Sequence, residues 1–459
     1  MTLALVVVAC LVSVHFDLSL KSSSAEGFCP ADAKLVVAAS DFAAFWEKAV
    51  HCDVGRQATA RPPIQFRRLE VAIRNAAGIR PTPVRWRLWL GNRLLAATGE
   101  TGSGLCVRPG LLLRAVHLLR RFLGVEAAEE GMYRFGDFLY AWRDGFLIIS
   151  ESRAYVLASL AARRPALGYA PNADEVHVYV SGPPETEIHL CAADGLPVHG
   201  WSAVEVSRRR TGLTLPNAWP KQPLIELSAS AWRDLSAVLA ACDGFCTLLP
   251  GYERSRHFAF LLAQRWGLDA LPAGWDEPSD ECSLALFPLA TSESLPVPEI
   301  ALILRGVAPP RGAHPLAPLE AVTEAFPYEW DGFPGSVTPI LGERLALCLG
   351  SHDNDWFVTS NEPLMAQLAG RLAAGEAVEA DIMVRVDWRQ VGQLAARLLC
   401  RAGELELFAG KDLEDVEFEF VPLAELTATL GMMEIHGRTD KGGVAFEGRL
   451  ARIESEVGQ

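Results

Sequence analysis

The two halves of this chain repeat each other, and this repetition constrains the fold more than any single motif does. The segment Pro81–Gly91 reads again as Pro296–Gly306, 215 positions later. Three more segments recur in the same order, with offsets that drift between 206 and 215: Gly136–Leu139 as Gly342–Leu345, Phe146–Glu151 as Trp356–Asn361, and Ala158–Arg163 as Ala366–Arg371. The repeat is much longer than the about 20 to 50 residues of solenoid units. It therefore predicts two similar lobes produced by a tandem duplication.

A chain of 459 residues exceeds what one hydrophobic core usually serves, so two or three domains are expected. We predict a signal or membrane-anchor segment over residues 1–25, a first α+β module over 33–220, and a second over 221–459 with a β-rich C-terminal extension. Short strands joined by tight turns outnumber possible crossover connections. This pattern favours mainly antiparallel sheets with helices packed on one face.

The composition is that of a well-packed, acidic protein. Half of the residues are hydrophobic, 21% are charged, and the formal net charge is -14. Large cores are therefore expected and disorder is not. Because an acidic surface repels phosphate backbones, we predict no nucleic-acid partner. The basic run Arg208–Arg210 precedes Thr211 and Gly212, which indicates the exposed tip of a hairpin; a binding patch is the alternative.

The N-terminus carries an apolar run, Leu3–Val14, that is interrupted only by Ser13. Its 12 residues fall short of the about 20 that a helix needs to cross a bilayer. The length suits the apolar part of a signal peptide, although no Lys or Arg precedes it. We expect export or membrane anchoring through this segment; a buried N-terminal strand or helix is the alternative.

The ten cysteines are scattered, which is not the pattern of a small disulfide scaffold. Five of them lie in or beside apolar runs and are expected in the core: Cys106, Cys191, Cys282, Cys348 and Cys400. In an oxidising compartment, Cys242 with Cys246 and Cys29 with Cys52 could each form a disulfide bond.

A strand followed by a capping residue and a helix occurs three times. The three occurrences begin at Leu35, Pro223 and Ile382, and the helices carry Trp46, Trp232 and Trp388 near their starts, where we expect them to pack in the core. Strands are predicted at Arg67–Arg74, Val84–Ala97, Ser202–Ser207 and Val416–Val421, and helices at Gly110–Leu123, Arg153–Arg163, Arg254–Trp266 and Leu316–Ala325.

Two loops resemble known ligand-binding motifs without completing them. Gly99–Gly104 has the glycines of a phosphate loop, but Leu105 and Cys106 replace the Lys and Ser or Thr that reach the phosphates and magnesium. Asp353–Asp355 starts like a calcium loop that lacks the later Gly and Glu. We expect a glycine turn and a polar hairpin turn.

His177 and His189 are the only candidate metal pair. They lie on adjacent predicted strands with Glu175 and Cys191 nearby, and a hairpin register that pairs them would bring the imidazoles together. A shift of one residue would send them to opposite faces. The expected arrangement is a pair of half-exposed histidines, and we assign no catalytic, cofactor-binding or metal-ligating residue.

The segments Leu35–Trp46, Pro298–Arg305 and Trp356–Ser360, with the glycine hairpin near the C-terminus, resemble a bacterial family of uncharacterised, membrane-anchored envelope proteins. That family is grouped only as a domain of unknown function. The resemblance covers residues 30–455 and rests on packing patterns. It implies an extracytoplasmic location with a short N-terminal anchor, and it brings no catalytic residues.

These observations lead to three hypotheses. The preferred one is a non-enzymatic exported or membrane-anchored envelope protein that binds a protein or another ligand. The second is a hydrolase-type enzyme of unrecognised family, with its site in a cleft between the lobes. The third is a cytoplasmic structural protein. No cofactor is predicted, and the expected partners are the membrane, through the N-terminal segment, and an unknown protein or small ligand.

Overall fold

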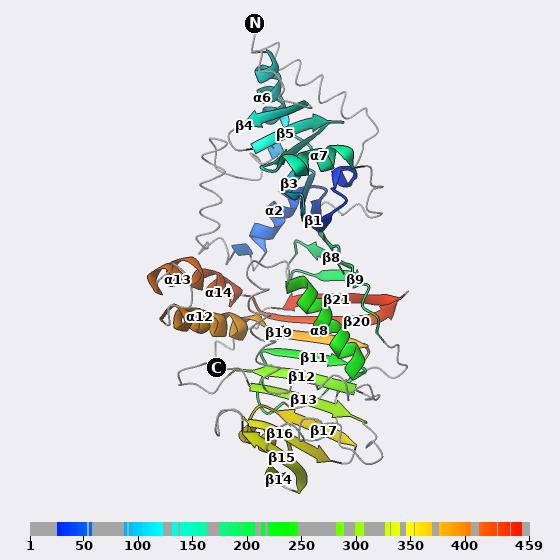
Figure 1. Cartoon of the computed structure of the whole chain (residues 1–459), viewed down its shortest axis with the longest axis vertical. Helices are drawn as coiled ribbons and strands as arrows, with labels where there is room; N and C mark the ends of the chain where they lie inside the picture. Colours follow the sequence, from blue (N-terminus) through cyan, green and yellow to red (C-terminus); the bar gives the residue numbers. More distant parts are fainter. Residues whose placement is uncertain are drawn as a thin grey trace. The chain divides into compact units, whose positions relative to one another are not determined.

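The computed structural model describes most of the chain from Ala25 to Ala451. The described residues are 25–52, 55–56, 87–89, 91–122, 131–135, 138–162, 175–182, 184–193, 195–206, 213–215, 219–246, 281–288, 299–306, 326–330, 332–339, 346–352, 354–369, 376–404, 413–428, 430–440 and 442–451. They form two compact units, Met1–Gly200 and Trp201–Gln459, each with an antiparallel sheet and helices (Figure 1). The predicted mixture of antiparallel sheet and helix, an α+β class, is confirmed.

The first unit is a sheet that begins from the strand Ala33–Ala39. Its elements are η1 (Ala25–Phe28), β1 (Ala33–Ala39), α2 (Phe42–His51), β2 (Leu94–Gly99), β3 (Gly102–Val107), α6 (Leu111–Phe122), β4 (Met132–Phe135), β5 (Phe138–Arg143), β6 (Phe146–Ser150), α7 (Arg153–Ala161), β7 (Glu175–Val180), β8 (Thr186–Cys191) and the start of β9 (Val198–Ser202). The strands pair in the order β4–β5–β6–β3–β2–β1–β7–β8, and every pair is antiparallel.

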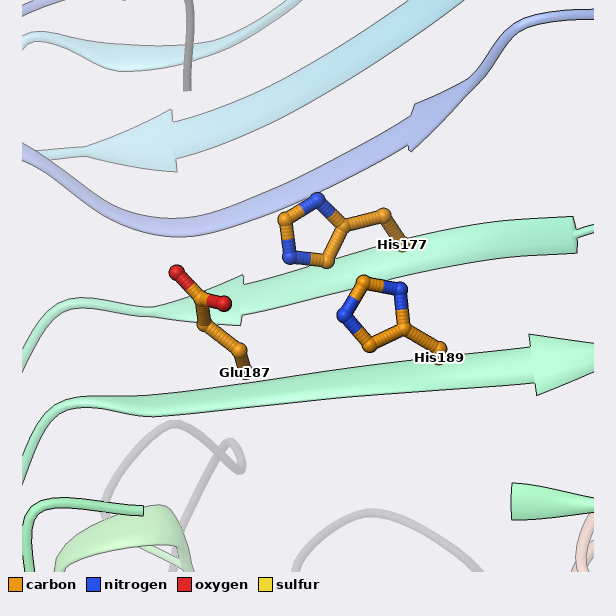
Figure 2. Close-up of side chains that lie close together, drawn as sticks. All are labelled: His177, Glu187 and His189. Atoms are coloured by element: carbon orange, nitrogen blue, oxygen red, sulfur yellow. The ribbon is translucent and has the colours of Figure 1, made fainter. Parts of the chain in front are cut away.

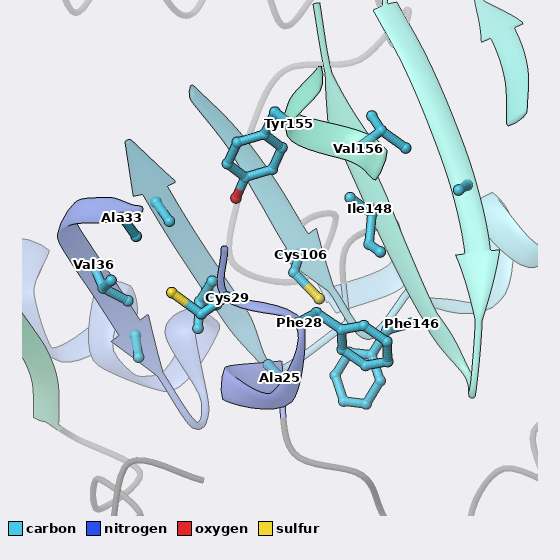
Figure 3. Packing of buried hydrophobic residues seen from close by; sticks show 14 of the residues in the cluster. Ala25, Phe28, Cys29, Ala33, Val36, Cys106, Phe146, Ile148, Tyr155 and Val156 are labelled. Carbon is cyan, nitrogen blue, oxygen red and sulfur yellow. The ribbon is translucent and has the colours of Figure 1, made fainter. Parts of the chain in front are cut away.

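The main core of the first unit lies between this sheet, η1 and α7 (Figure 3). Tyr155 of α7 is 1% exposed and shares the core with Cys106 and Ile148 of the sheet. Phe28 of η1 packs on Phe146, with ring centroids 5.4 Å apart. The opposite face of the sheet packs Leu147 and Tyr140 against Leu113 of α6. Helices therefore cover both faces of this sheet.

A glycine allows the close approach of α7 to the sheet. A Cβ atom added at Gly104 of β3 would lie 2.2 Å from Cε1 of the buried Tyr155 ring and 2.8 Å from the carbonyl oxygen of Ile149. We expect Gly104→Ala to lower the free energy of unfolding by about 1–3 kcal/mol, because the packed ring has no room to move. Urea unfolding followed by tryptophan fluorescence measures this loss. The matched control is Gly182→Ala, where no atom lies within 4 Å of the added Cβ and stability should not fall; equal losses in both variants would contradict the prediction.

The second unit repeats the mixture of strands and helices. Its elements are β10 (Leu213–Leu215), β11 (Ile225–Ala229), α8 (Trp232–Cys246), β12 (Glu281–Phe287), β13 (Glu299–Arg305), β14 (Phe326–Trp330), β15 (Phe333–Pro339), β16 (Ala346–His352), β17 (Asp355–Thr359), α11 (Glu362–Ala369), β18 (Glu376–Val378), β19 (Ile382–Asp387), α12 (Trp388–Glu404), α13 (Leu413–Glu419), α14 (Val421–Thr427), β20 (Met432–Asp440) and β21 (Gly443–Ala451). The strands pair in the order β14–β15–β16–β17–β13–β12–β11–β19–β20–β21, all antiparallel, and β10 pairs separately with β18.

Two cores lie on opposite faces of the second sheet. Leu235 of α8 packs with Leu227 and Ala229, whereas Leu364 of α11 packs with Ala285. Ala285 pairs with Glu226, which neighbours Leu227 on β11 and therefore points to the other face. The prediction of helices on one face is therefore wrong for both units, because the strands carry apolar side chains on both sides and each side needs a cover.

A strand followed by a helix is found at all three predicted sites, and a capping side chain is seen at two of them. Asp41 Oδ1 accepts a hydrogen bond of 2.9 Å from the Ala44 amide at the start of α2, and Asp387 Oδ1 accepts one of 3.1 Å from Gln390 at the start of α12. The tryptophans behave differently. Trp46 is 45% exposed, so its predicted core position is wrong, and Trp388 is half-buried. The Trp232 side chain lies outside the described residues.

Some predicted elements are wrong. Residues 87–89 are helical and the strand begins at Leu94, so Val84–Ala97 is not one strand. The predicted strand Val416–Val421 is wrong, because its residues lie in and between α13 and α14; among the described side chains of α13 only Val416 is fully buried, while Phe418 is 59% exposed. The strand expected at Ser202–Ser207 is instead β9, which ends at Ser202. The predicted elements Arg67–Arg74, Arg254–Trp266 and Leu316–Ala325 lie outside the described residues, as does the Arg208–Arg210 run.

Cys29 and Cys52 are both buried and form no disulfide bond with each other. Cys242 and Cys246 lie in α8, and their side chains are outside the described residues. Three of the five cysteines predicted in the core are buried, and Cys191 and Cys400 are intermediate. In the part of the chain that the structure describes, which excludes residues 1–24, no helix is both long and apolar enough to cross a membrane.

Candidate functional site: a His-His-Glu cluster on the β7–β8 hairpin

The β7–β8 hairpin brings the two strand histidines face to face. Val180 pairs with Thr186 at the turn, and this register places His177 directly opposite His189. The imidazole rings stack with centroids 4.5 Å apart and an angle of 8° between their planes. The side chains are not half-exposed as predicted: His177 is 2% exposed and His189 is 6% exposed. Strand β1 lies beside β7 in the sheet, with Ala38 opposite His177.

Glu187 completes the cluster from the same strand as His189. Residues two apart on a strand share one face, so the Glu187 carboxylate lies beside both imidazoles (Figure 2). One ligand atom from each of His177, Glu187 and His189 can be chosen so that all three lie within 4.8 Å of one another. Sequence reasoning missed Glu187. The spacing Glu-x-His on one strand, opposite a second His, is the signal that would have found it.

Glu175 and Cys191, which the sequence places near the two histidines, lie farther along the hairpin. Glu175 pairs with Cys191, and the Cys191 thiol donates a hydrogen bond of 3.6 Å to Glu175 Oε1. Neither belongs to the group of three potential ligand atoms. The hairpin thus carries a continuous polar row on one face, with the histidine pair at its centre.

The surroundings favour the neutral form of His189. The face that carries the cluster also carries Val36 and Ala38 of β1, which belong to the main core of the unit. Burial lowers the pKa of His189, and the neighbouring His177 and His199 lower it further. Neutral imidazole is the form that coordinates a metal ion, so this environment prepares His189 for binding.

A third histidine extends the stack toward solvent. His199 of β9 stacks on the opposite side of the row, with its ring centroid 4.9 Å from that of His189 and an interplanar angle of 9°. Unlike the other two, His199 is exposed. The imidazoles therefore form a graded series from the exposed His199 to the buried His177.

The cluster fits a late first-row divalent ion such as Zn²⁺. Two imidazoles and one carboxylate are the ligands of many catalytic zinc sites, which leave a fourth position open. In a tetrahedral site with bonds of about 2.0–2.2 Å, neighbouring ligand atoms lie about 3.4 Å apart. The ligand atoms therefore need to approach by up to about 1.4 Å, and the stacked imidazole rings need to turn so that their in-plane lone pairs converge on the ion; rotation about the soft terminal torsions of His and Glu allows both movements.

The second unit holds a related polar cluster in an ion-paired form. Arg385 of β19 contacts two carboxylates: its Nη1 lies 3.1 Å from Glu226 Oε2, and its Nε lies 3.4 Å from Glu434 Oε2. His436 Nε2 lies 2.6 Å from Glu434 Oε1, and Trp219 Nε1 donates a hydrogen bond of 2.8 Å to Glu226. The positive guanidinium group thus holds this cluster together.

The pKa shifts in this second cluster follow from burial and charge. Burial raises the pKa of Glu226, and the Trp219 hydrogen bond and the Arg385 charge offset only part of that effect. Burial also acts to raise the pKa of Glu434, but the hydrogen bond to His436 and the charge of Arg385 outweigh it and lower the pKa. Glu434 therefore stays ionised beside its two partners.

The two loops that resemble binding motifs have structural roles. Gly99–Gly104 forms the β2–β3 turn, where Gly102 has a φ of +116° and Asp32 Oδ2 accepts a 2.7 Å hydrogen bond from the Thr101 amide. Asp355 pairs with His352 at the β16–β17 turn, and its carboxylate accepts a hydrogen bond of 3.2 Å from the Gly306 amide. The expected turns are confirmed at both places.

None of the family models, curated proteins or solved structures with which the chain was compared matches it.

Proposed function

We propose that this chain is a zinc-binding protein built from two copies of one α+β module, with its metal site in the first copy. The observation that carries the proposal is the convergence of His177, His189 and Glu187 on one face of the β7–β8 hairpin. Buried imidazoles with a carboxylate form a donor set of the kind that Zn²⁺ prefers. The protein binds the ion through its own side chains and needs no further cofactor.

The order of the strands supports the duplication. The first sheet runs β4–β5–β6–β3–β2–β1–β7–β8, and the second contains β15–β16–β17–β13–β12–β11–β19–β20 in the corresponding order. The helices also correspond: α2 follows β1 as α8 follows β11, and α7 follows β6 as α11 follows β17. Ser152 caps α7 and Asn361 caps α11 through their side-chain oxygens. On this comparison β3, rather than the segment Pro81–Gly91, corresponds to β13.

The two copies share two of the three proposed metal ligands. The tripeptide Glu187–His189 on β8 is repeated as Glu434–His436 on the corresponding strand β20. The cross-strand partner differs, because His177 faces His189 whereas Met383 faces His436. The residue opposite the glutamate also differs, since Tyr179 pairs with Glu187 and Arg385 pairs with Glu434.

This difference explains why only the first copy should bind a metal. In the second copy, Arg385 supplies the positive charge that the Glu434 carboxylate needs. Among the described residues, no Lys or Arg forms an ion pair with Glu187, while a second imidazole is added through His177. A divalent cation between these ligands would supply the charge that Arg385 supplies in the second copy.

The proposal is tested by isothermal titration of the metal-free full chain with Zn²⁺ at about pH 7.5, where imidazoles are mostly neutral. We expect saturable binding of one Zn²⁺ per chain. Mg²⁺ is the control ion and should not bind, because it prefers an octahedral shell of oxygen ligands. Absence of saturable Zn²⁺ binding would contradict the proposed function.

We further propose that the protein is exported or held at the membrane by residues 1–25 and acts there by binding rather than by catalysis. The apolar run Leu3–Val14 supports this location. Fractionation of cells that produce the full chain tests the proposal. The protein should be recovered outside the cytosol or with membranes; recovery from the cytosol with Met1 retained would contradict it.

A further inference from the structure

We infer that His199 is the loading ligand of the zinc site: it captures the hydrated ion at the surface and passes it to the buried His189 and His177 and the half-buried Glu187. This inference rests on the proposed function, because it describes how the same site fills and empties. It assigns a kinetic role to a residue outside the group of three ligands.

The stacking of the three imidazoles supports the role. His189 lies between His199 and His177, with ring centroids 4.9 Å and 4.5 Å away and nearly parallel planes. Exposure falls along the row, from the exposed His199 to His189 at 6% and His177 at 2%. An ion that reaches the buried ligands from the His199 side therefore meets this imidazole first.

The chemistry of ligand exchange gives the row its advantage. A hydrated Zn²⁺ loses water molecules one at a time as protein ligands replace them. A buried site has no water to fill the coordination shell of an ion that is moving into it. A ring nitrogen of His199 would replace the first water molecule, and a ring nitrogen of His189 would then replace a second before His199 dissociates from the ion. The imidazole steps exchange one neutral donor for another, and the Glu187 carboxylate then replaces a further water molecule, so no electron has to be moved.

Because His199 binds the ion only while it enters or leaves the site, loss of this side chain should slow Zn²⁺ exchange without weakening the final complex. We expect His199→Gln to keep one Zn²⁺ per chain and to change the affinity less than about threefold, while Zn²⁺ transfer to a chromophoric chelator slows by about tenfold. The absorbance of the chelator complex in a stopped-flow instrument gives the transfer rate, and titration with the same chelator gives the affinity. His51→Gln is the matched control, since His51 is an exposed histidine of the same unit that lies outside the row; it should leave both values unchanged.

The outcomes separate this inference from the proposed function. If His199→Gln transfers Zn²⁺ as fast as the unaltered protein, His199 is not a loading ligand, although the zinc site itself stands. If the variant loses affinity by about a hundredfold, His199 is a resident ligand and the inference is likewise overturned. If the unaltered chain binds no Zn²⁺, the proposed function fails together with the inference.

Discussion

Replacing His189 with alanine is expected to lower the affinity for Zn²⁺ by at least about a hundredfold. Replacing His436, the corresponding residue of the second unit, with alanine should leave the affinity unchanged. His189 supplies one of only two nitrogen ligands, and the remaining His177 and Glu187 cannot close a zinc site by themselves. The matched variant is His436→Ala, because His436 follows Glu434 at the same spacing on the corresponding strand. Isothermal titration of both variants measures the difference.

Two controls make the His189 result interpretable. Far-ultraviolet circular dichroism shows whether the chain keeps its secondary structure, and His189→Gln retains a polar side chain of similar reach should the alanine variant unfold. Unchanged Zn²⁺ affinity in folded His189→Ala would rule out the proposed site. Loss of binding in His436→Ala would instead place the ion in the second unit.

The second large effect is expected at Arg385. The Arg385→Met variant should lose about 3 kcal/mol of unfolding free energy, because Glu226 is 1% exposed and would lose the guanidinium group that balances its buried charge. Part of the charge would be relieved by protonation, since burial already raises the pKa of Glu226. Urea unfolding at about pH 7 measures the loss.

A second substitution and a surface control identify the cause of the Arg385 effect. Glu226→Gln in the Arg385→Met background removes the buried charge and should recover most of the lost stability. Arg438→Met breaks an ion pair with Glu379 in which both side chains are more than half exposed, so no measurable change is expected. If the double variant is no more stable than Arg385→Met, the loss comes from packing rather than from charge.

Local turn and cap chemistry made part of the fold predictable. The Asp144–Gly145 turn, the capped start of α2 after Asp41, and the β7–β8 hairpin all follow from residue types whose conformational preferences act over a few residues. Alternating apolar residues were less reliable. Val416–Val421 alternates as a strand does, yet α13 packs its one buried valine against α12, which only tertiary contacts decide.

The site was harder to predict than the fold. Pairing of His177 with His189 depends on the register of one hairpin, and a shift of one residue would separate them. The strand beside His177 in the sheet is β1, which is distant in sequence. The contribution of Glu187 could be read from its spacing to His189, but its meaning becomes clear only beside Glu434 and Arg385 in the second unit.

Anomalous diffraction from crystals of the zinc-loaded full chain, collected on both sides of the zinc absorption edge, tests the central claim most directly. The account predicts one zinc peak within bonding distance of His177, His189 and Glu187, with none beside Glu434 and His436. A peak that lies elsewhere, or the same three side chains without a peak in crystals grown with excess Zn²⁺, would contradict it.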